Sequence, residues 1–168
     1  MIFVTVGTHE QQFNRLVQFI DELKRDNHIK EDVVIQTGYC SYEPKYCSFQ
    51  KLFPYDEMVE KVNAARIVIT HGGPSSFVMP LRIGKIPIVV PRQKGYHEHV
   101  NDHQLEFCTE LENRRHNIIV VSEIDSLREI IADYDKIVAR MEATQADNSD
   151  NFNNRFKQIV KEMFADKS

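Results

Sequence analysis

A glycine-rich turn that could bind an anion directly follows the apolar run at residues 67–69. It reads His71-Gly72-Gly73-Pro74-Ser75-Ser76. The continuous apolar run is typical of a strand that is buried on both faces, and Pro74 favours the first turn of a helix. The amides and hydroxyls of Ser75 and Ser76 would then lie at a helix N-terminus, where unpaired N–H groups and the helix dipole attract phosphate. The turn therefore predicts an anion site.

Two further polar segments are expected to join this turn. Residues 92–104 follow the apolar run at residues 86–91 and contain side chains that can hydrogen-bond to hydroxyl groups, namely Glu98, Asn101, Asp102, His103 and Gln104. The segment Gly7-Thr8-His9-Glu10 follows the first apolar run of the chain. Because open parallel sheets bind ligands where strands end beside helix N-termini, we expect the three segments to converge.

A site of this composition could hold a nucleotide diphosphate. The helix start at Pro74 would bind the phosphates, the turn with Phe53 and Tyr55 the base, and residues 98–104 the hydroxyl groups. Neutral amides and helix dipoles can stabilise a departing diphosphate without a metal ion, so we expect no metal cofactor. Four nearby basic residues should either flank this site or form ordinary solvated surface: Arg82, Lys85, Arg92 and Lys94.

Short apolar runs alternate with amphipathic helices along the chain, and these elements must position the polar segments. Strands are predicted at residues 2–6, 33–35, within 46–53, at 67–69, 86–91 and 117–121. The first helix is indicated by apolar residues at spacings of three and four, Phe13, Leu16, Val17, Ile20 and Leu23. Another helix is expected at residues 100–115. The alternation predicts an α/β fold, a Rossmann-like doubly wound parallel sheet of about six strands.

The length of 168 residues, of which 42% are hydrophobic and 27% charged, suits a single globular domain. We place this domain at residues 1–145. Residues 146–168 are expected to form a C-terminal amphipathic helix that packs on the domain or docks a partner chain. Its apolar stripe comprises Phe152, Phe156, Ile159, Val160, Met163 and Phe164. Without a partner, this stripe could drive self-association into a homo-oligomer.

Charge, cysteine content and hydropathy exclude several classes of protein. A formal charge of -4 without a basic face argues against nucleic-acid binding. Three cysteines without a CxxC pair favour a reducing cytoplasm over a disulfide framework. No apolar run has the length of a membrane span, so we expect any membrane association to come from a partner.

Three common motifs are incomplete in this sequence. Residues 7–10 do not complete a GxGxxG pattern, and no acidic residue closes the second strand, which disfavours a dinucleotide oxidoreductase. No GxxxxGK[ST] phosphate loop is present. His99 and His103 would share one face of the expected helix, but Asn101 stands where the zincin motif has its second histidine. We therefore expect no metal site.

Two long stretches carry a resemblance to a known family. The glycine turn at residues 71–76, followed by residues 84–92, resembles the C-terminal domain of glycosyltransferase family 28. That domain is the donor-binding half of two-domain B-type glycosyltransferases. Residues 3–13 and 98–104 are more similar still to the small soluble subunits of split bacterial capsule and exopolysaccharide glycosyltransferases. Those subunits are similar in turn to the soluble half of the eukaryotic dolichyl-diphosphate N-acetylglucosaminyltransferase.

The resemblance implies an inverting transfer of a sugar, galactose or glucuronic acid, from a UDP-sugar to a lipid-diphosphate-linked saccharide in surface polysaccharide synthesis. This chain would be the catalytic, donor-binding subunit. A separate membrane-anchored subunit would bind the acceptor and recruit this chain from the cytoplasm to the cytoplasmic face of the membrane.

The resemblance also implies which residues bind the donor. They are Gly7, Thr8, His9, Phe53, Tyr55, His71, Gly72, Gly73, Ser75, Ser76, Arg92, Glu98, Asn101, Asp102, His103 and Gln104. Met79 stands where many family members carry a ribose-binding glutamate, so Glu98 is the alternative for that role. His9 and Glu10 are the candidates in this chain for the catalytic base, which in related enzymes often comes from the other domain.

Two other functional classes fit the same fold. One is a non-catalytic subunit that binds a nucleotide sugar or recruits a partner. The other is a nucleotide-sugar epimerase-like protein, although a chain of 168 residues lacks the second domain that such an enzyme needs to close over its substrate.

Overall fold

The computed structural model describes residues 1–145 and 157–162. Met1–Tyr134 form one compact unit, and Asp135 onward belongs to a second. The second unit contains most of α6 (Tyr134–Gln145), and residues 157–162 are helical. Of the apolar stripe expected near the C-terminus, Phe152, Phe156, Met163 and Phe164 lie outside the described residues. The expected domain boundary after residue 145 stays a prediction.

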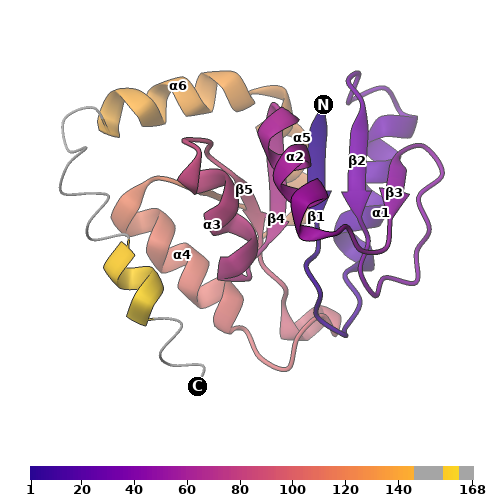
Figure 1. Cartoon of the computed structure of the whole chain (residues 1–168), viewed down its shortest axis with the longest axis horizontal. Helices are drawn as coiled ribbons and strands as arrows, with labels where there is room; N and C mark the ends of the chain where they lie inside the picture. The colour runs from indigo at the N-terminus through magenta and orange to yellow at the C-terminus, as the bar shows by residue number, and fades with distance from the viewer. Residues whose placement is uncertain (146–156, 163–168) are drawn as a thin grey trace. The chain divides into compact units, whose positions relative to one another are not determined.

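Met1–Tyr134 is built around a six-stranded sheet in which every neighbouring pair of strands is parallel. The strands are β1 (Ile2–Thr5), β2 (Val33–Gln36), β3 (Ser48–Gln50), β4 (Ile67–His71), β5 (Ile88–Val90) and β6 (Ile119–Val120). Their spatial order is β3-β2-β1-β4-β5-β6 (Figure 1). The chain therefore runs outward from β1 to one edge, returns to β4 and runs to the other edge. This confirms the predicted α/β fold and puts its topological switch point between β1 and β4.

Helices cover both faces of this sheet. Figure 1 shows α2 (Tyr55–Ala64), α3 (Pro74–Arg82) and α4 (His103–Arg115) in front of it and α1 (Asn14–Arg25) behind it. The short helix η2 (Ile124–Ser126) contacts α1 and leads into α5 (Leu127–Ala132). The core is apolar: Ile2, Phe3 and Val4 of β1 and the stripe Leu16, Val17, Ile20 and Leu23 of α1 are buried. The periodicity of the first helix is thus confirmed.

The helix expected at residues 100–115 begins three residues later, at His103. The preceding chain forms the 3-10 helix η1 (Lys94–Tyr96) and then His97, whose φ of 58° lies in the left-handed region. The backbone amide of His103 donates to Oδ1 of Asn101, and the backbone amide of Asn101 donates to Nδ1 of His99. These local hydrogen bonds compete with helix formation. His99 therefore lies outside the helix and does not share a helical face with His103.

Candidate functional site

Gly7 and His71, which follow β1 and end β4, meet at the switch point of the sheet. A Cβ added to Gly7 would lie 2.3 Å from Nε2 of His71, and the φ of Gly7 is +76°. A Cβ added to Gly73 would lie 2.2 Å from Cε1 of the same ring. The imidazole thus fills the space between two backbone segments that can approach it only because they lack side chains.

Hydrogen bonds define the tautomer of His71. The backbone amide of Gly73 donates to Nδ1 at 3.1 Å, so Nδ1 is the unprotonated nitrogen of the neutral ring. Nε2 lies 2.9 Å from Oγ of Ser76 and can donate to it. The hydroxyl hydrogen of Ser76 is then directed toward another acceptor. This arrangement leaves the Ser76 hydroxyl able to donate to a ligand at the start of α3.

The helix N-terminus predicted at Pro74 is confirmed, since α3 begins at this residue. Several amides of the turn already donate within the protein: that of Gly72 to Oε1 of Gln104 at 3.2 Å, and that of Ser76 to the carbonyl of Gly73 at 3.0 Å. Ser75 is exposed. An arriving phosphate would therefore meet the helix terminus through Ser75 and the Ser76 hydroxyl, whereas the glycines supply the space for the turn.

Three successive backbone amides after β5 donate to side chains from residues 98–104. The amide of Arg92 donates to Gln104 at 3.1 Å, that of Gln93 to Glu98 at 3.1 Å, and that of Lys94 to Asp102 at 2.8 Å. Oε1 of Gln104 thus joins the ends of β4 and β5, which leaves its NH₂ group as the part that can donate to a ligand. We call residues 92–104 the β5 loop.

The β1 loop, residues 6–12, reaches the β5 loop through a pair of histidines. The ring centroids of His9 and His99 lie 4.8 Å apart, and the backbone amide of Gln11 donates to Nδ1 of His9 at 3.1 Å. Burial and then the charge of Arg92 lower the pKa of His9, while Glu10 acts to raise it. His9 is consequently neutral at pH 7, with its hydrogen on Nε2 because Nδ1 accepts the Gln11 amide, so it can take up a proton only when that hydrogen bond breaks. Thr8 and Glu10 are exposed.

The turn at Phe53 is connected to Gly7 by two polar side chains. The backbone amide of Phe53 donates to Oε1 of Gln36 at 2.9 Å, and Nε2 of Gln36 donates to Oγ1 of Thr5 at 2.9 Å. Oγ1 of Thr5 also accepts the amide of Gly7 at 3.1 Å. Thr5 and Gln36 were not among the residues expected at the site, although polar residues at the ends of apolar strands are a usable signal. Tyr55 is exposed by 69%, so its ring is accessible to a ligand.

Arg92 and Glu98 belong to the expected donor site, but both side chains are fully buried. The carboxylate of Glu98 accepts two hydrogen bonds from Arg15 and one from the amide of Gln93. Glu98 therefore does not stand in for the ribose-binding glutamate in this structure. Met79, at the position of that glutamate, packs against an apolar cluster that includes Phe3.

Two of the four basic residues expected near the turn, Lys85 and Arg92, bind other parts of the domain. Nζ of Lys85 donates to the carbonyls of Val62, Asn63 and Ala65 at 2.7, 2.7 and 2.6 Å, and so caps the C-terminus of α2. Burial lowers the pKa of Lys85. Since Arg92 is buried as well, a bound anion would depend on the helix terminus and hydroxyl groups rather than on these two cations.

An open hollow of about 350 Å³ lies at the carboxyl end of β2. It is lined by residues 37–43 together with Phe49 and Lys51, and Nζ of Lys51 lies 4.8 Å from the ring centroid of Tyr39. None of the expected donor residues lines it. The hollow is therefore distinct from the turn at His71.

Open α/β proteins, many nucleotide-binding ones among them, bind ligands where loops converge at the switch point of a parallel sheet, beside a helix N-terminus. Residues 1–163 match the glycosyltransferase family 28 C-terminal domain, and the chain belongs to this family. It is thus a donor-binding glycosyltransferase domain, which confirms the class expected from the sequence motifs.

Two known proteins have parts that are similar to this chain. The UDP-N-acetylglucosamine transferase subunit ALG13 of Yarrowia lipolytica is 36% identical over 100 residues, which are 60% of this chain and 42% of that protein. The similarity thus spans less than half of that relative. The glycosyltransferase SnogD of Streptomyces nogalater has a TM-score of 0.41 and 16% identity over 71% of this chain and 30% of its own. In the described part of this chain, no helix combines the length and apolar character that a membrane crossing requires.

Proposed function

We propose that this chain is the donor subunit of a split, inverting glycosyltransferase that uses a UDP-sugar. The observation that carries the proposal is the junction of Gly7, His71 and Ser76 at the switch point of a family 28 domain. A helix N-terminus and a hydroxyl donor converge there, while Lys85 and Arg92 are hydrogen-bonded to other parts of the domain. The similarity to a subunit named as a UDP-N-acetylglucosamine transferase supports both the donor class and the division into subunits.

The residues have separate roles in this proposal. The diphosphate binds at the start of α3, with Ser75 and Ser76 as donors, and Thr8 and His9 approach it from the β1 loop. Asn101, Asp102, His103 and the NH₂ group of Gln104 bind sugar hydroxyls. The nucleotide base of the donor lies next to Phe53 and Tyr55. The site stabilises the departing UDP through dipoles and hydroxyls, so transfer requires no metal ion.

In the reaction, an acceptor hydroxyl attacks the anomeric carbon of the donor, and the bond to the diphosphate oxygen breaks with inversion. The acceptor proton passes to a base and the electron pair leaves with UDP. His9, neutral at pH 7 and next to His99, and the exposed Glu10 are the candidates for the base in this chain. A partner subunit can supply the base instead.

We further propose that a membrane-anchored partner binds a lipid-diphosphate-linked saccharide and holds this chain at the cytoplasmic face of the membrane. Galactose or glucuronic acid is the sugar transferred in surface polysaccharide synthesis. These finer assignments extend the family membership and rest on the resemblance of residues 3–13 and 98–104 to subunits of split glycosyltransferases.

Calorimetric titration tests the proposal. The purified chain is titrated with UDP, UDP-galactose, UDP-glucuronic acid and UDP-N-acetylglucosamine, each with and without a chelator. We expect UDP to bind equally well with the chelator, and the sugar series to identify the donor. Absence of binding both alone and with the membrane-anchored partner would contradict the proposal. Binding that the chelator abolishes would contradict only the metal-independent mechanism.

A further inference from the structure

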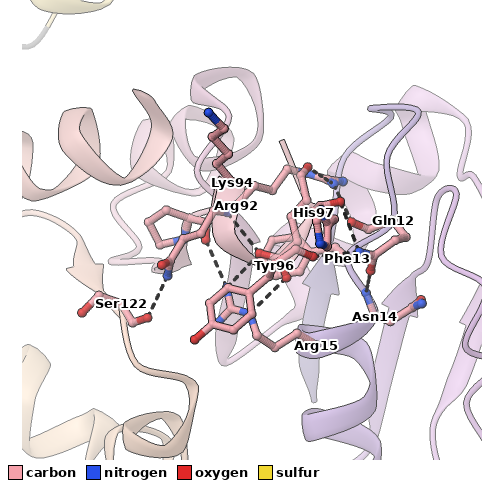
Figure 2. Close-up of polar contacts among 12 residues, drawn as sticks. Gln12, Phe13, Asn14, Arg15, Arg92, Lys94, Tyr96, His97 and Ser122 are labelled. Atoms are coloured by element: carbon pink, nitrogen blue, oxygen red, sulfur yellow. Dashed lines mark hydrogen bonds and ion pairs between the residues drawn. The ribbon is translucent and has the colours of Figure 1, made fainter. Parts of the chain in front are cut away.

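Two arginines connect the β1 loop with the β5 loop, one reaching from each side. Arg15, at the start of α1, contacts the β5 loop, and Arg92, at the start of the β5 loop, contacts the β1 loop (Figure 2). Because the strand order is β1-β4-β5, the two loops can meet only across the carboxyl end of β4. That end carries the turn at His71. We call Arg15, Arg92 and Glu98 the arginine clasp.

Arg15 binds the β5 loop through charge, geometry and stacking. Its Nε and Nη2 donate to the two carboxylate oxygens of Glu98, each at 3.0 Å. Its guanidinium carbon lies 4.3 Å from the ring centroid of Tyr96. The side chain of Glu98 is completely buried and that of Arg15 is only 13% exposed. This two-pronged geometry is specific to arginine and fixes orientation as well as distance.

Arg92 makes the reverse connection. Its Nη2 donates to the carbonyl of Val6 at 2.7 Å, and its Nη1 donates to the carbonyls of Gln11 at 2.8 Å and Gln12 at 3.2 Å. Nη1 also lies 3.2 Å from the carbonyl oxygen of Glu98. Nε2 of Gln12 in turn donates to carbonyls of the β5 loop. The backbones of both loops are thus tied to one another by side chains.

Glu98 transmits the position of Arg15 to the ligand-facing part of the β5 loop. Its Oε1 accepts the amide of Gln93, the middle one of the three amides described above. The neighbouring amides, of Arg92 and Lys94, bind the side chains of Gln104 and Asp102. A shift of Glu98 therefore moves the backbone that orients both Asp102 and Gln104.

We propose that Arg15 is a positioning residue that orders the β5 loop for the donor, an inference that rests on the proposed function. Replacing a buried ion pair by apolar residues of similar volume is often neutral for stability, so stability alone does not account for this pair. The Arg15–Glu98 pair instead holds the β1 loop and the β5 loop in a single arrangement around the carboxyl end of β4. Misplacing a binding group by about 1 Å can reduce function by roughly a hundredfold.

Three variants separate positioning from stability. Arg15→Met leaves Glu98 as an unpaired buried charge and is expected to lower the melting temperature. Arg15→Met combined with Glu98→Gln removes both charges and should recover much of that loss. Arg15→Lys keeps the charge without the two-pronged geometry. Arg25→Met is the matched control, because Arg25 lies on the same helix and pairs with the exposed Asp26.

Amide hydrogen exchange of residues 92–104 and calorimetric titration with the UDP-sugar that the wild-type chain binds are the measurements. In the double variant we expect faster exchange in the β5 loop and binding of the UDP-sugar weaker by about tenfold or more, even where the melting temperature recovers. Arg15→Lys should be intermediate, and Arg25→Met should behave as the wild type.

Unchanged exchange in the double variant would overturn the proposal, and so would faster exchange with wild-type affinity for the UDP-sugar. If the wild-type chain fails to bind UDP with its partner present, the proposed function fails and the donor part of the inference fails with it. The exchange rates, which need no ligand, still decide whether Arg15 orders the β5 loop.

Discussion

The ring of His71 occupies space that side chains at Gly7 and Gly73 would need, and this packing gives the two glycines different requirements. Gly73 needs only the space, since its φ of -74° is open to other residues. Gly7 needs the space and also a positive φ. At the scale of single residues, the conformation of the turn at His71 therefore depends on the absence of side chains at Gly7 and Gly73 as much as on its polar groups.

Gly73→Ala is expected to destabilise the protein by about 1–3 kcal/mol, because the new methyl group must displace the imidazole of His71. The displaced ring would also lose its contact with Ser76, so UDP binding should weaken. Urea unfolding and calorimetric titration measure the two effects. Gly95→Ala is the control, since nothing lies within 4 Å of a Cβ added there. Wild-type stability of Gly73→Ala would show that the turn is less tightly packed than described.

The lowered pKa of His9 predicts a pH dependence of UDP binding. A phosphate beside His9 favours the protonated ring, whereas burial and Arg92 keep the free protein's ring neutral. Binding should then take up a proton, and affinity should rise as the pH falls from about 8 toward the ordinary histidine value of about 6.5. In His9→Gln, the affinity for UDP should change with pH only as much as the protonation of UDP itself requires. Equal slopes for the two proteins would place His9 away from the phosphates.

The lowered pKa of His9 has the opposite effect on the stability of the ligand-free protein, which should decrease as the pH falls. Because the folded-state pKa of His9 lies below its unfolded value, the unfolded chain binds the proton more readily. The contribution of His9 is fully present above the unfolded pKa and is lost as the pH falls from that value through the lowered folded-state pKa. Chemical unfolding of wild type and His9→Gln without ligand measures this separately.

At the scale of elements, a buried carboxylate on α1 shapes the connection between β2 and β3. Asp21 is fully buried and accepts the hydroxyl of Tyr42 at 2.7 Å and the amides of Lys45, Tyr46 and Cys47 at 2.9, 2.8 and 3.1 Å. Burial acts to raise the pKa of Asp21, but these donors together hold it below the usual value. Asp21 also raises the pKa of Tyr42 to about 12, so the phenol keeps its proton.

Asp21→Asn should destabilise the protein by about 2–4 kcal/mol at pH 7, because one carboxylate oxygen becomes an NH₂ group that faces other donors. The folded-state pKa is lowered, so the stabilisation by Asp21 is present above the unfolded value of 3.8 and is lost as the pH falls below it. Urea unfolding at several pH values should show the two proteins converging in acid. Asp26→Asn, on an exposed residue next to α1, is the control. A constant difference down to pH 3 would assign the effect to shape rather than to charge.

At the scale of the whole molecule, Met1–Tyr134 contains the sheet and all the expected donor residues. A chain that ends at Gln145 should therefore bind UDP as tightly as the full chain. Residues 146–168, expected to pack on the domain or dock a partner, should be required for the partner-dependent activity if docking is their role. Titration with UDP and co-purification with the membrane-anchored subunit measure the two properties. Loss of UDP binding in the shorter chain would instead assign residues 146–168 to the donor domain.

Much of the fold could be predicted from local patterns. Apolar runs separated by amphipathic helices gave the number and parallel direction of the strands, and Pro74 marked the start of α3. The start of α4 was wrong by three residues because side-chain hydrogen bonds of His99 and Asn101 hold the preceding turn. Such interactions depend on the conformation of a few residues and have no periodic signal.

By itself, the sequence determined which loops form the candidate site, because the ends of parallel strands must lie at one edge of the sheet. It could not determine which side chains face a ligand. Arg92 and Glu98 look like binding residues in the sequence, yet both are buried and serve the arginine clasp. No local pattern in the sequence marks Arg15, since its partner Glu98 is distant in sequence. The two side chains come together only because the sheet places β1 and β5 on either side of β4. Pairing across a sheet is a property of the folded chain, so only the tertiary structure decided these roles.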